Sequence, residues 1–387
     1  GSALAVALSG AGLSIALVEA QSLQRGELPA AAGLGDFDAR VSALTPRSRL
    51  LLERLRAWDA IAAYRQCAYR HMAVWDAEGT GAIDFDCAEL NAPALGHIVE
   101  NRAIVNALLQ QVEAAGDICC IAPDSVLACT REESGRVCLA LASGMELNAA
   151  LVVGADGARS RIRELMGFAT REWDYGHRAI VCTAEVAKPH QDTAWQRFLS
   201  SGPLAFLPLP GAGQQFCSIV WSLKDALVDD LLALDDAAFC GELDAAFESR
   251  LGGVVGVSPR FAFPLRQRHA VDYVQPGVAL VADAAHTIHP LAGQGINLGL
   301  ADVAVLAQEV LAARERGLDP GALVVLSRYQ RQRKGENLLM MGAMDGFKRL
   351  FEQEALPLRW LRNAGMRGVG AITPLKHRLM KHAMGLG

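Results

Sequence analysis

The chain has 387 residues, of which 51% are hydrophobic and 20% are charged, and its formal net charge is -5. This composition is typical of a globular protein with a full core, and the length predicts two packed domains. The acidic balance argues against a dedicated nucleic-acid binder. The nine cysteines include no C-x-x-C pair, which predicts reduced thiols in a cytoplasmic protein and no metal site.

The first segment, residues 1–18, carries no charge and is rich in Ala and Leu. A membrane span needs about twenty apolar residues, and a signal peptide needs a basic leader. Neither description fits, because the segment 9–12 (SGAG) interrupts the run and no basic residue precedes it. We therefore predict a buried helix, a glycine turn and a short strand that ends at Glu19.

This opening matches the second half of a βαβ unit that binds a dinucleotide. In that unit a strand enters a G-x-G-x-x-G turn, a helix follows, and the second strand ends in an acidic residue. Gly1 takes the place of the third glycine and Glu19 that of the acid. We expect the sequence to begin just after the phosphate-binding turn, with the first strand of the domain missing from it.

The order of patterns along the rest of the chain predicts the domains. Residues 46–55 have helical apolar spacing, whereas residues 172–265 read as strands punctuated by Pro and Gly. Beyond about residue 298 the pattern is helical. The expected fold is α/β, with a mostly antiparallel sheet domain inserted into a Rossmann-like domain. The predicted units are 1–171 with 266–330 for the Rossmann-like domain, 172–265 for the sheet, and 331–387 for C-terminal helices.

The segment DAAHTIHPLAGQGIN, residues 283–297, follows an apolar run that predicts a buried parallel strand. Asp283 at the end of that strand faces the crevice where α/β proteins bind ligands. Gly293 and Gly295 let the backbone approach a planar ligand closely. The helix that follows presents a partial positive charge to an anion such as a reduced flavin ring. An ordinary strand-to-helix loop is the alternative.

A second motif, residues 154–163, follows another predicted strand. Asp156 and Gly157 predict a tight turn, and Ser160 predicts the start of a helix that carries Arg161 and Arg163. Arginines beside a dinucleotide site could contact a pyrophosphate or steer a nicotinamide cofactor. A plain Asp-Gly turn remains the alternative.

Together these patterns resemble the FAD-dependent aromatic hydroxylases, with their dinucleotide fingerprint, Asp-Gly motif and Gly-Asp motif in that order. Within that group the chain is most similar to the ubiquinone-biosynthesis hydroxylases, which act on polyprenylated phenols and benzoquinols. The collinear segments that carry the resemblance are 38–44, 72–76, 95–101, 173–176, 205–209, 218–221 and 283–297.

The resemblance implies FAD and NAD(P)H as cofactors. It assigns Glu19 to the adenosine ribose, Arg40 and Asn101 to the ribityl or phosphate part, and Asp283 to the ribityl or pyrophosphate region. Asp156 would support both FAD binding and the reaction with NAD(P)H. The residues implied to border the isoalloxazine ring are Pro290, Gly293, Gln294, Gly295, Ile296 and Asn297.

The implied reaction is hydroxylation of the aromatic ring of a polyprenylated substrate by O₂. Phe206, Pro208 and Trp221, together with Trp195, are candidates for a pocket around that ring, although core packing explains these side chains equally well. No catalytic side chain is assigned, because the cofactor carries the chemistry. The lipid tail suggests peripheral contact with the inner membrane, for which the basic amphipathic segment 376–381 is a candidate beside its reading as a solvated helix end. A multiprotein quinone-synthesis complex and a homo-oligomer stay open.

Some features favour other interpretations. The family motif has Gly where this chain has Ala282, and the additional methyl is expected to weaken FAD binding. A non-catalytic subunit of a quinone-synthesis complex, a flavin reductase and a halogenase are the rival functions, although the Trp-x-Trp-x-Ile element of halogenases does not occur. His286 and His289 are either proton carriers or structural residues.

Overall fold

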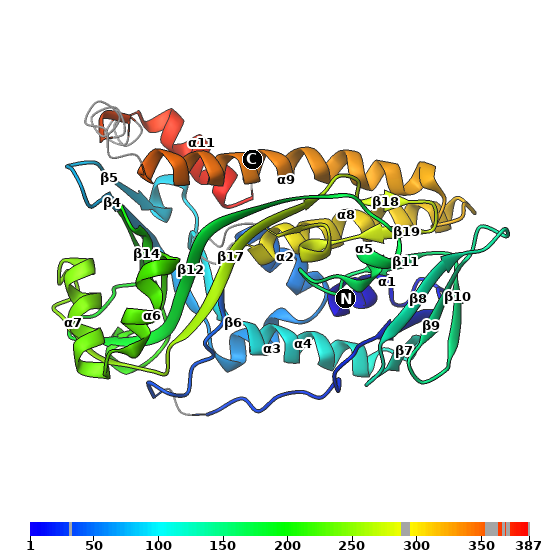
Figure 1. Cartoon of the computed structure of the whole chain (residues 1–387), viewed down its shortest axis with the longest axis horizontal. Coiled ribbons are helices and arrows are strands. Elements are labelled where there is room, and N and C mark those ends of the chain that lie inside the picture. Colours follow the sequence, from blue (N-terminus) through cyan, green and yellow to red (C-terminus); the bar gives the residue numbers. More distant parts are fainter. Residues whose placement is uncertain (31–32, 288–294, 353–362, 366–367, 369–371, 386–387) are drawn as a thin grey trace.

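The structure, a computed structural model, describes residues 1–30, 33–287, 295–352, 363–365, 368 and 372–385 (Figure 1). Three residues implied to border the isoalloxazine ring, namely Pro290, Gly293 and Gln294, lie outside the described residues, as does His289.

The amino-terminal segment has the predicted helix, turn and strand. Helix α1 (Ser2–Leu8) begins after Gly1 and is followed by Gly10 and Gly12, whose φ angles of 77° and 67° give the turn that glycine readily adopts. Strand β1 (Ile15–Val18) then pairs in parallel with β7 (Ile118–Ile121). This arrangement confirms the predicted order of helix, glycine turn and strand.

A second parallel pair consists of β11 (Val152–Gly154) and β19 (Val278–Leu280), with β18 (Val274–Gln275) antiparallel beside β19. All three side chains of β19 are fully buried, which explains the uninterrupted apolar run in the sequence. Helices α1, α4 (Asn101–Ala114) and α8 (Gly295–Glu315) contribute to the same hydrophobic core.

Among the described residues, the largest sheet has nine strands and is antiparallel except where β13 meets β4. The predicted boundaries at residues 172 and 265 fall within its two long strands, β12 and β17, which lie side by side along the molecule (Figure 1). The sheet also includes β4 and β5, which precede the predicted insertion. Its path is β20 (His286–Thr287), β17 (Phe261–Ala270), β12 (Thr170–Val186), β15 (Phe216–Lys224), β14 (Gly202–Pro208), β13 (Thr193–Leu199), β4 (His71–Asp76) and β5 (Ala82–Asp86), with β16 (Val254–Val257) also paired to β12.

The two faces of this sheet pack against different elements. Helices α6 (Asp225–Ala233) and α7 (Asp236–Phe247) share a core with Leu204 and Phe206 of β14. Ala205 and Leu207 alternate with these residues and face a core that includes residues of a small sheet. That sheet consists of β2 (Val41–Leu44), β6 (Gly96–Glu100) and β3 (Cys67–Tyr69).

The remaining elements complete the Rossmann-like part and the carboxy-terminal side. Helix α2 begins as predicted, because the Thr45 hydroxyl accepts a hydrogen bond from the Ser48 amide and Pro46 stands in the first turn. These elements are α2 (Pro46–Arg54), α3 (Trp58–Tyr64), β8 (Val126–Arg131), β9 (Val137–Leu141), β10 (Glu146–Ala149), α5 (Arg161–Leu165), α9 (Leu323–Glu352) and α11 (Thr373–Ala383).

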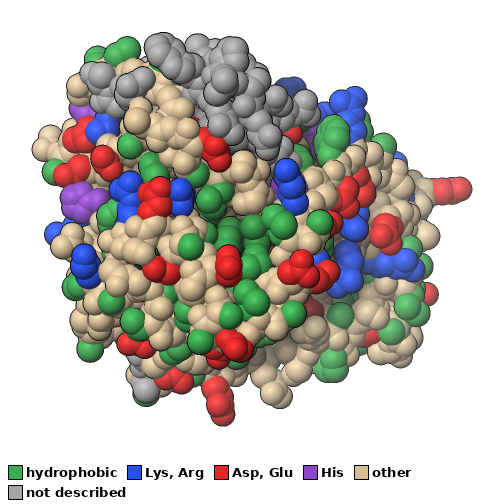
Figure 2. All heavy atoms as spheres, turned by 60° about the vertical axis from the view of Figure 1, so that its left-hand side comes forward, with side chains coloured by type: hydrophobic (Ala, Val, Ile, Leu, Met, Phe, Trp, Pro, Cys, Tyr) green, Lys and Arg blue, Asp and Glu red, His purple; other side chains and the backbone are tan. Residues whose placement is uncertain are grey.

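Among the described helices, α8 is long and apolar enough to cross a membrane, yet 56% of its most apolar stretch is buried inside the protein. It packs against α9 and α1, as a core helix does. On the face in Figure 2, acidic and basic side chains are interspersed around an apolar central area.

Candidate cofactor and substrate site

Asp283 lies just beyond the end of β19, where its side chain stays exposed to solvent. The surrounding protein nevertheless removes part of the water around its carboxyl, and this desolvation raises the pKa. The charges of His286 and Arg40 oppose that effect. Arg40 immediately precedes β2, far from Asp283 in the sequence. The fold therefore brings a cation and a carboxylate, both predicted to contact the cofactor, close enough to interact electrostatically.

The Asp-Gly motif lies beside the first βαβ segment. The carboxylates of Glu19 and Asp156 both interact electrostatically with the amino group of Gly1, so these three predicted residues are close together. Asp156 also accepts hydrogen bonds from the Arg161 amide at 2.6 Å and the Ile162 amide at 3.1 Å. Asp156 therefore also caps the start of α5, besides lying close to Gly1.

The arginines of this motif divide into buried and exposed ones. Ser160 caps α5 as predicted, and the Arg163 side chain, only 3% exposed, donates to the carbonyls of Ala284 at 3.0 Å and Ala158 at 2.8 Å. Arg163 therefore joins the Asp-Gly motif to the segment around Asp283. Arg159 and Arg161 remain exposed.

The two asparagines predicted at the cofactor hold the edge of β2. The Asn101 amide donates to the Arg40 carbonyl at 2.9 Å, and its side chain accepts from the Ser42 hydroxyl at 2.6 Å. Asn297, in the first turn of α8, accepts from the Thr45 amide at 3.0 Å and donates to the Ala43 carbonyl at 2.8 Å. The backbone amide of Asn101 thus positions Arg40, and the side chain of Asn297 positions the start of α8, where Gly295 and Ile296 lie half-buried.

A small cavity, of about 20 Å³, adjoins this edge of β2. Tyr69 contributes a phenol whose pKa burial raises to about 12, so it stays neutral at pH 7. The other lining side chains are mostly apolar, and Trp195 is the predicted one among them. The lining consists of Ala43, Tyr69, Met72, Ile98, Ala194, Trp195, Gln196, Ala205 and Leu207.

The other predicted pocket residues are core residues instead. Phe206 is fully buried, and its ring stacks on Phe247 of α7 with centroids 3.8 Å apart. Trp221 is 5% exposed and lies near Phe239 of the same helix, and Pro208 is buried on β14. Strand parity explains the difference, because the family resemblance identified the strand but not the face that each side chain takes.

A buried charged cluster, which was not predicted from the sequence, holds the backbone next to Asp283. Asp302 of α8 is fully buried and accepts from the Ala282 amide at 3.0 Å, from His286 Nε2 at 2.5 Å and from Arg333 Nε at 2.9 Å. Asn337 Nδ2 donates to it at 3.2 Å. Burial alone would raise the pKa of Asp302, but the charges and hydrogen bonds of His286 and Arg333 hold it below its ordinary value.

His286 is thus a buried structural partner of Asp302. Asp302 is the one acidic residue in the largely apolar stretch 296–307 of α8, and this was the signal in the sequence that could have revealed the cluster. Ala282, where the family has Gly, has a φ of +54°, in the left-handed region that favours glycine. The hydrogen bond from its backbone amide to Asp302 helps to hold that conformation.

The donor set of this site fits FAD. Glu19 is an exposed acid at the end of β1, where a ribose hydroxyl can donate to it. Arg40 offers a cation for phosphate and Asp283 a carboxylate for sugar hydroxyls. A Cβ built on Gly1 would lie 3.3 Å from Leu17, so the opening of α1 is tight around a residue without a side chain.

Comparison with known proteins agrees with this assignment. The FAD binding domain family matches residues 1–338. Solved structures with the same fold include p-nitrophenol 4-monooxygenase from Pseudomonas putida, with a TM-score of 0.77 and 18% identity over 100% of this chain and 95% of that one. A probable FAD-dependent monooxygenase from Pseudomonas aeruginosa has a TM-score of 0.77 and 20% identity over 95% and 96%. The chain is thus an FAD-binding protein with the fold of FAD-dependent monooxygenases.

More similar relatives narrow this class. The chain is 38% identical to 3-demethoxyubiquinol 3-hydroxylase of Escherichia coli over 386 residues, which is 100% of this chain and 96% of the relative. It is 39% identical to ubiquinone hydroxylase UbiL of Rhodospirillum rubrum over 385 residues, or 100% and 87%. The chain belongs to the family of FAD-dependent hydroxylases of ubiquinone biosynthesis.

Proposed function

We propose that this protein is an NAD(P)H-dependent monooxygenase that hydroxylates the aromatic ring of a polyprenylated phenol or benzoquinol. In the net reaction, one atom of O₂ enters a ring C–H bond and the other leaves as water, with two electrons from NAD(P)H. The names of the relatives support the substrate class. The observation that carries the proposal is that one residue joins the apolar cavity to the predicted cofactor site. Ala43 lines the cavity, and its carbonyl accepts a hydrogen bond from Asn297 at the start of α8.

Glu19 after β1, Arg40 before β2 and Asp283 beyond β19 would hold FAD, with Asp156 beside Gly1. When bound, FAD supplies the activation of oxygen and the transfer of the hydroxyl group. The exposed Arg159 and Arg161 are the side chains of the Asp-Gly motif that remain available to a nicotinamide cofactor. The Arg163 side chain instead donates its hydrogen bonds to the backbone carbonyls of Ala284 and Ala158.

The cavity, of about 20 Å³, is smaller than an aromatic ring, so its side chains would have to move apart to admit and orient the ring. Met72, Ile98 and Leu207 give it apolar walls that exclude water. The neutral Tyr69 hydroxyl can donate a hydrogen bond to a ring oxygen or accept one from a ring hydroxyl. In this proposal the lining residues bind and orient the substrate, and none of them transfers oxygen.

The test uses purified full-length protein loaded with FAD, a short-chain prenylated benzoquinol, NADH or NADPH, and ¹⁸O₂. We expect one ¹⁸O atom in the ring for each NAD(P)H consumed, as measured by mass spectrometry. Oxidation of NAD(P)H without a labelled product would indicate a flavin reductase. Protein that neither retains FAD nor converts the substrate would indicate a non-catalytic subunit.

We also propose that α11 brings this cytoplasmic enzyme to the inner membrane, where a polyprenyl substrate resides. Ile372 and Leu379 are 53% and 44% exposed, and Arg378 and Lys381 are exposed as well. We expect binding to vesicles that contain phosphatidylglycerol and little binding to pure phosphatidylcholine. Reversing Arg378 and Lys381 to Glu should weaken binding at least about 10-fold in a co-flotation assay, because each basic residue contributes about 1 kcal/mol. Equal flotation of the variant would contradict the role of α11.

A further inference from the structure

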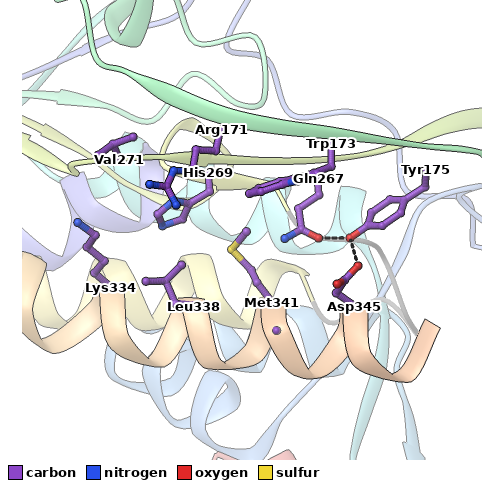
Figure 3. A pocket seen from close by; sticks show the side chains of 11 residues that line it. Arg171, Trp173, Tyr175, Gln267, His269, Val271, Lys334, Leu338, Met341 and Asp345 are labelled. Atoms are coloured by element: carbon purple, nitrogen blue, oxygen red, sulfur yellow. Dashed lines mark hydrogen bonds between the residues drawn. The ribbon is translucent and has the colours of Figure 1, made fainter. Parts of the chain in front are cut away.

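A second cavity, of about 400 Å³, lies between strands β12 and β17 and helix α9 (Figure 3). Its lining residues differ from those of the cavity beside Ala43. Trp173 and Arg171 enter it from β12, His269 from β17, and Leu338 and Met341 from α9. The volume is in the range of pockets that hold small molecules.

Arg171 is the cation of this cavity without a counter-charge. It is exposed and makes no ion pair or hydrogen bond with any side chain that the structure describes. The other cation, Lys334, lies 3.3 Å from a carboxylate oxygen of Asp272. Asp345 accepts a hydrogen bond from the Tyr175 hydroxyl at 3.4 Å. The guanidinium of Arg171 is therefore available to an anion.

His269 forms the buried end of the cavity. Its side chain is 4% exposed, and Nε2 has no hydrogen-bond partner among the described residues. Burial, together with the charges of His286 and Lys334, lowers its pKa to about 4. At pH 7 the ring is neutral, so one ring nitrogen donates and the other accepts. A buried polar atom without a partner is costly unless a ligand or water bonds to it.

The wall between these two polar groups suits an aromatic ring. Trp173 is 46% exposed although it is a large aromatic side chain. Met341 and Leu338 face it from α9 (Figure 3). An indole face and a thioether both make favourable contacts with a planar ring. The cavity thus places an unpaired cation, an aromatic wall and a buried hydrogen-bonding group around one space.

We propose that this cavity binds a small aromatic carboxylate, with the carboxylate on Arg171, the ring between Trp173 and Met341, and a polar substituent or water on His269. A guanidinium matches a carboxylate with two parallel hydrogen bonds. The proposal does not depend on the proposed function, because no residue of the cavity beside Ala43 takes part.

The test is isothermal titration calorimetry of the full-length, FAD-loaded protein with benzoate and with the neutral probe benzyl alcohol. We expect one benzoate site, with benzyl alcohol at least about 10-fold weaker because it lacks the charge-assisted hydrogen bonds. Arg171→Gln should weaken benzoate about 10-fold or more and leave benzyl alcohol unchanged. Arg171→Lys should retain part of the affinity. Arg131→Gln, at an exposed position on β8, is the matched control and should bind as the parent does.

Two further measurements exclude misfolding of the variant and binding of benzoate at the cavity beside Ala43. Circular dichroism melting should show that Arg171→Gln folds like the parent, because an exposed side chain is removed. Leu207→Phe, which narrows the cavity beside Ala43, should leave benzoate affinity unchanged. The proposal would be overturned by benzoate affinity that Arg171→Gln does not change, by its loss in Leu207→Phe, or by no binding up to about 10 mM.

Discussion

The segment beneath Asp283 and the face of β14 that lines the cavity are held in place by opposite means. Under Asp283, a fully buried carboxylate accepts hydrogen bonds from the backbone, a histidine and an arginine on three separate elements. On β14, by contrast, alternate residues pack into two apolar cores on either face. The charged cluster fixes a geometry through directional bonds, whereas the apolar strand fixes only which side chains face the cavity.

The largest effect is expected from breaking the charged cluster. Arg333→Met leaves Asp302 buried beside a single basic partner, and breaking a buried ion pair costs about 3–5 kcal/mol. We expect that decrease in the free energy of unfolding, measured by urea denaturation. FAD affinity, measured by flavin fluorescence, should fall as well, because Asp302 also holds the amide of Ala282.

The matched control lies on the same helix. Arg328 is 37% exposed and lies 4.0 Å from Glu309, so Arg328→Met should change stability by less than about 1 kcal/mol. Equal losses in the two variants would mean that the cluster contributes no more than a surface ion pair.

A smaller and different effect is expected on β14. Phe206→Ala removes a ring that stacks on Phe247, and the cavity it leaves should cost about 3 kcal/mol of stability. It should leave the KM for the prenylated substrate unchanged. Leu207→Phe should do the reverse, raising KM while costing about 1–2 kcal/mol. If both variants raised KM equally, the assignment of opposite faces would be wrong.

This contrast also explains how much the sequence could predict. The fold class and the position of Asp283 followed from contiguous motifs, because the end of a parallel strand meets the crevice. The role of Arg40 came from the family resemblance alone. Phe206 and Trp221 were candidates for a pocket because they are aromatic, but an aromatic residue fits either face of a strand. Only the partner elements, α7 on one side and β2 on the other, decide between the faces.

The missed residues show a second limit. Asp302 and Arg333 belong to different helices, and nothing local to Arg333 indicates which carboxylate it meets. The predicted boundary at residue 172 fell inside β12 because that strand runs without interruption through both parts. Long-range pairing of this kind leaves no signal within a window of ten or twenty residues.

Acid should destabilise the protein through two buried histidines, His97 on β6 and His269 on β17. Burial lowers the pKa of His97 and of His269 to about 4, with nearby positive charges adding to the effect. Since the unfolded chain binds these protons near pH 6.5 and the folded chain does not, stability is complete above pH 6.5 and is lost as the pH falls toward 4. We expect about 1–2 kcal/mol per histidine between pH 7 and 5.

Substitution separates the two contributions. His97→Gln should reduce the pH dependence of the urea midpoint by about half, and adding His269→Gln should remove most of the remainder. An unchanged slope in the double variant would show that other groups carry the acid sensitivity.

A coupled effect concerns Ala282 and Gly299, which lie at the boundary between the charged cluster and α8. A Cβ built on Gly299 would lie 2.7 Å from the Cβ of Ala282, so the two positions cannot both carry a methyl without a shift. Gly299→Ala alone should therefore destabilise the protein by about 1–3 kcal/mol, as overpacking does. Ala282→Gly should be neutral or stabilising by up to about 1 kcal/mol, because its φ of +54° no longer opposes a side chain.

In the double variant the sign of the Gly299 substitution should reverse. With the methyl of residue 282 gone, alanine at position 299 fits within α8 and gains the roughly 0.5–1 kcal/mol by which alanine exceeds glycine in a helix. The coupling energy from the double-mutant cycle should thus exceed about 1 kcal/mol. Additive effects would mean that the backbone of residues 281–283 moves freely, and the directional bonds from Asp302 would then not fix the position of Asp283.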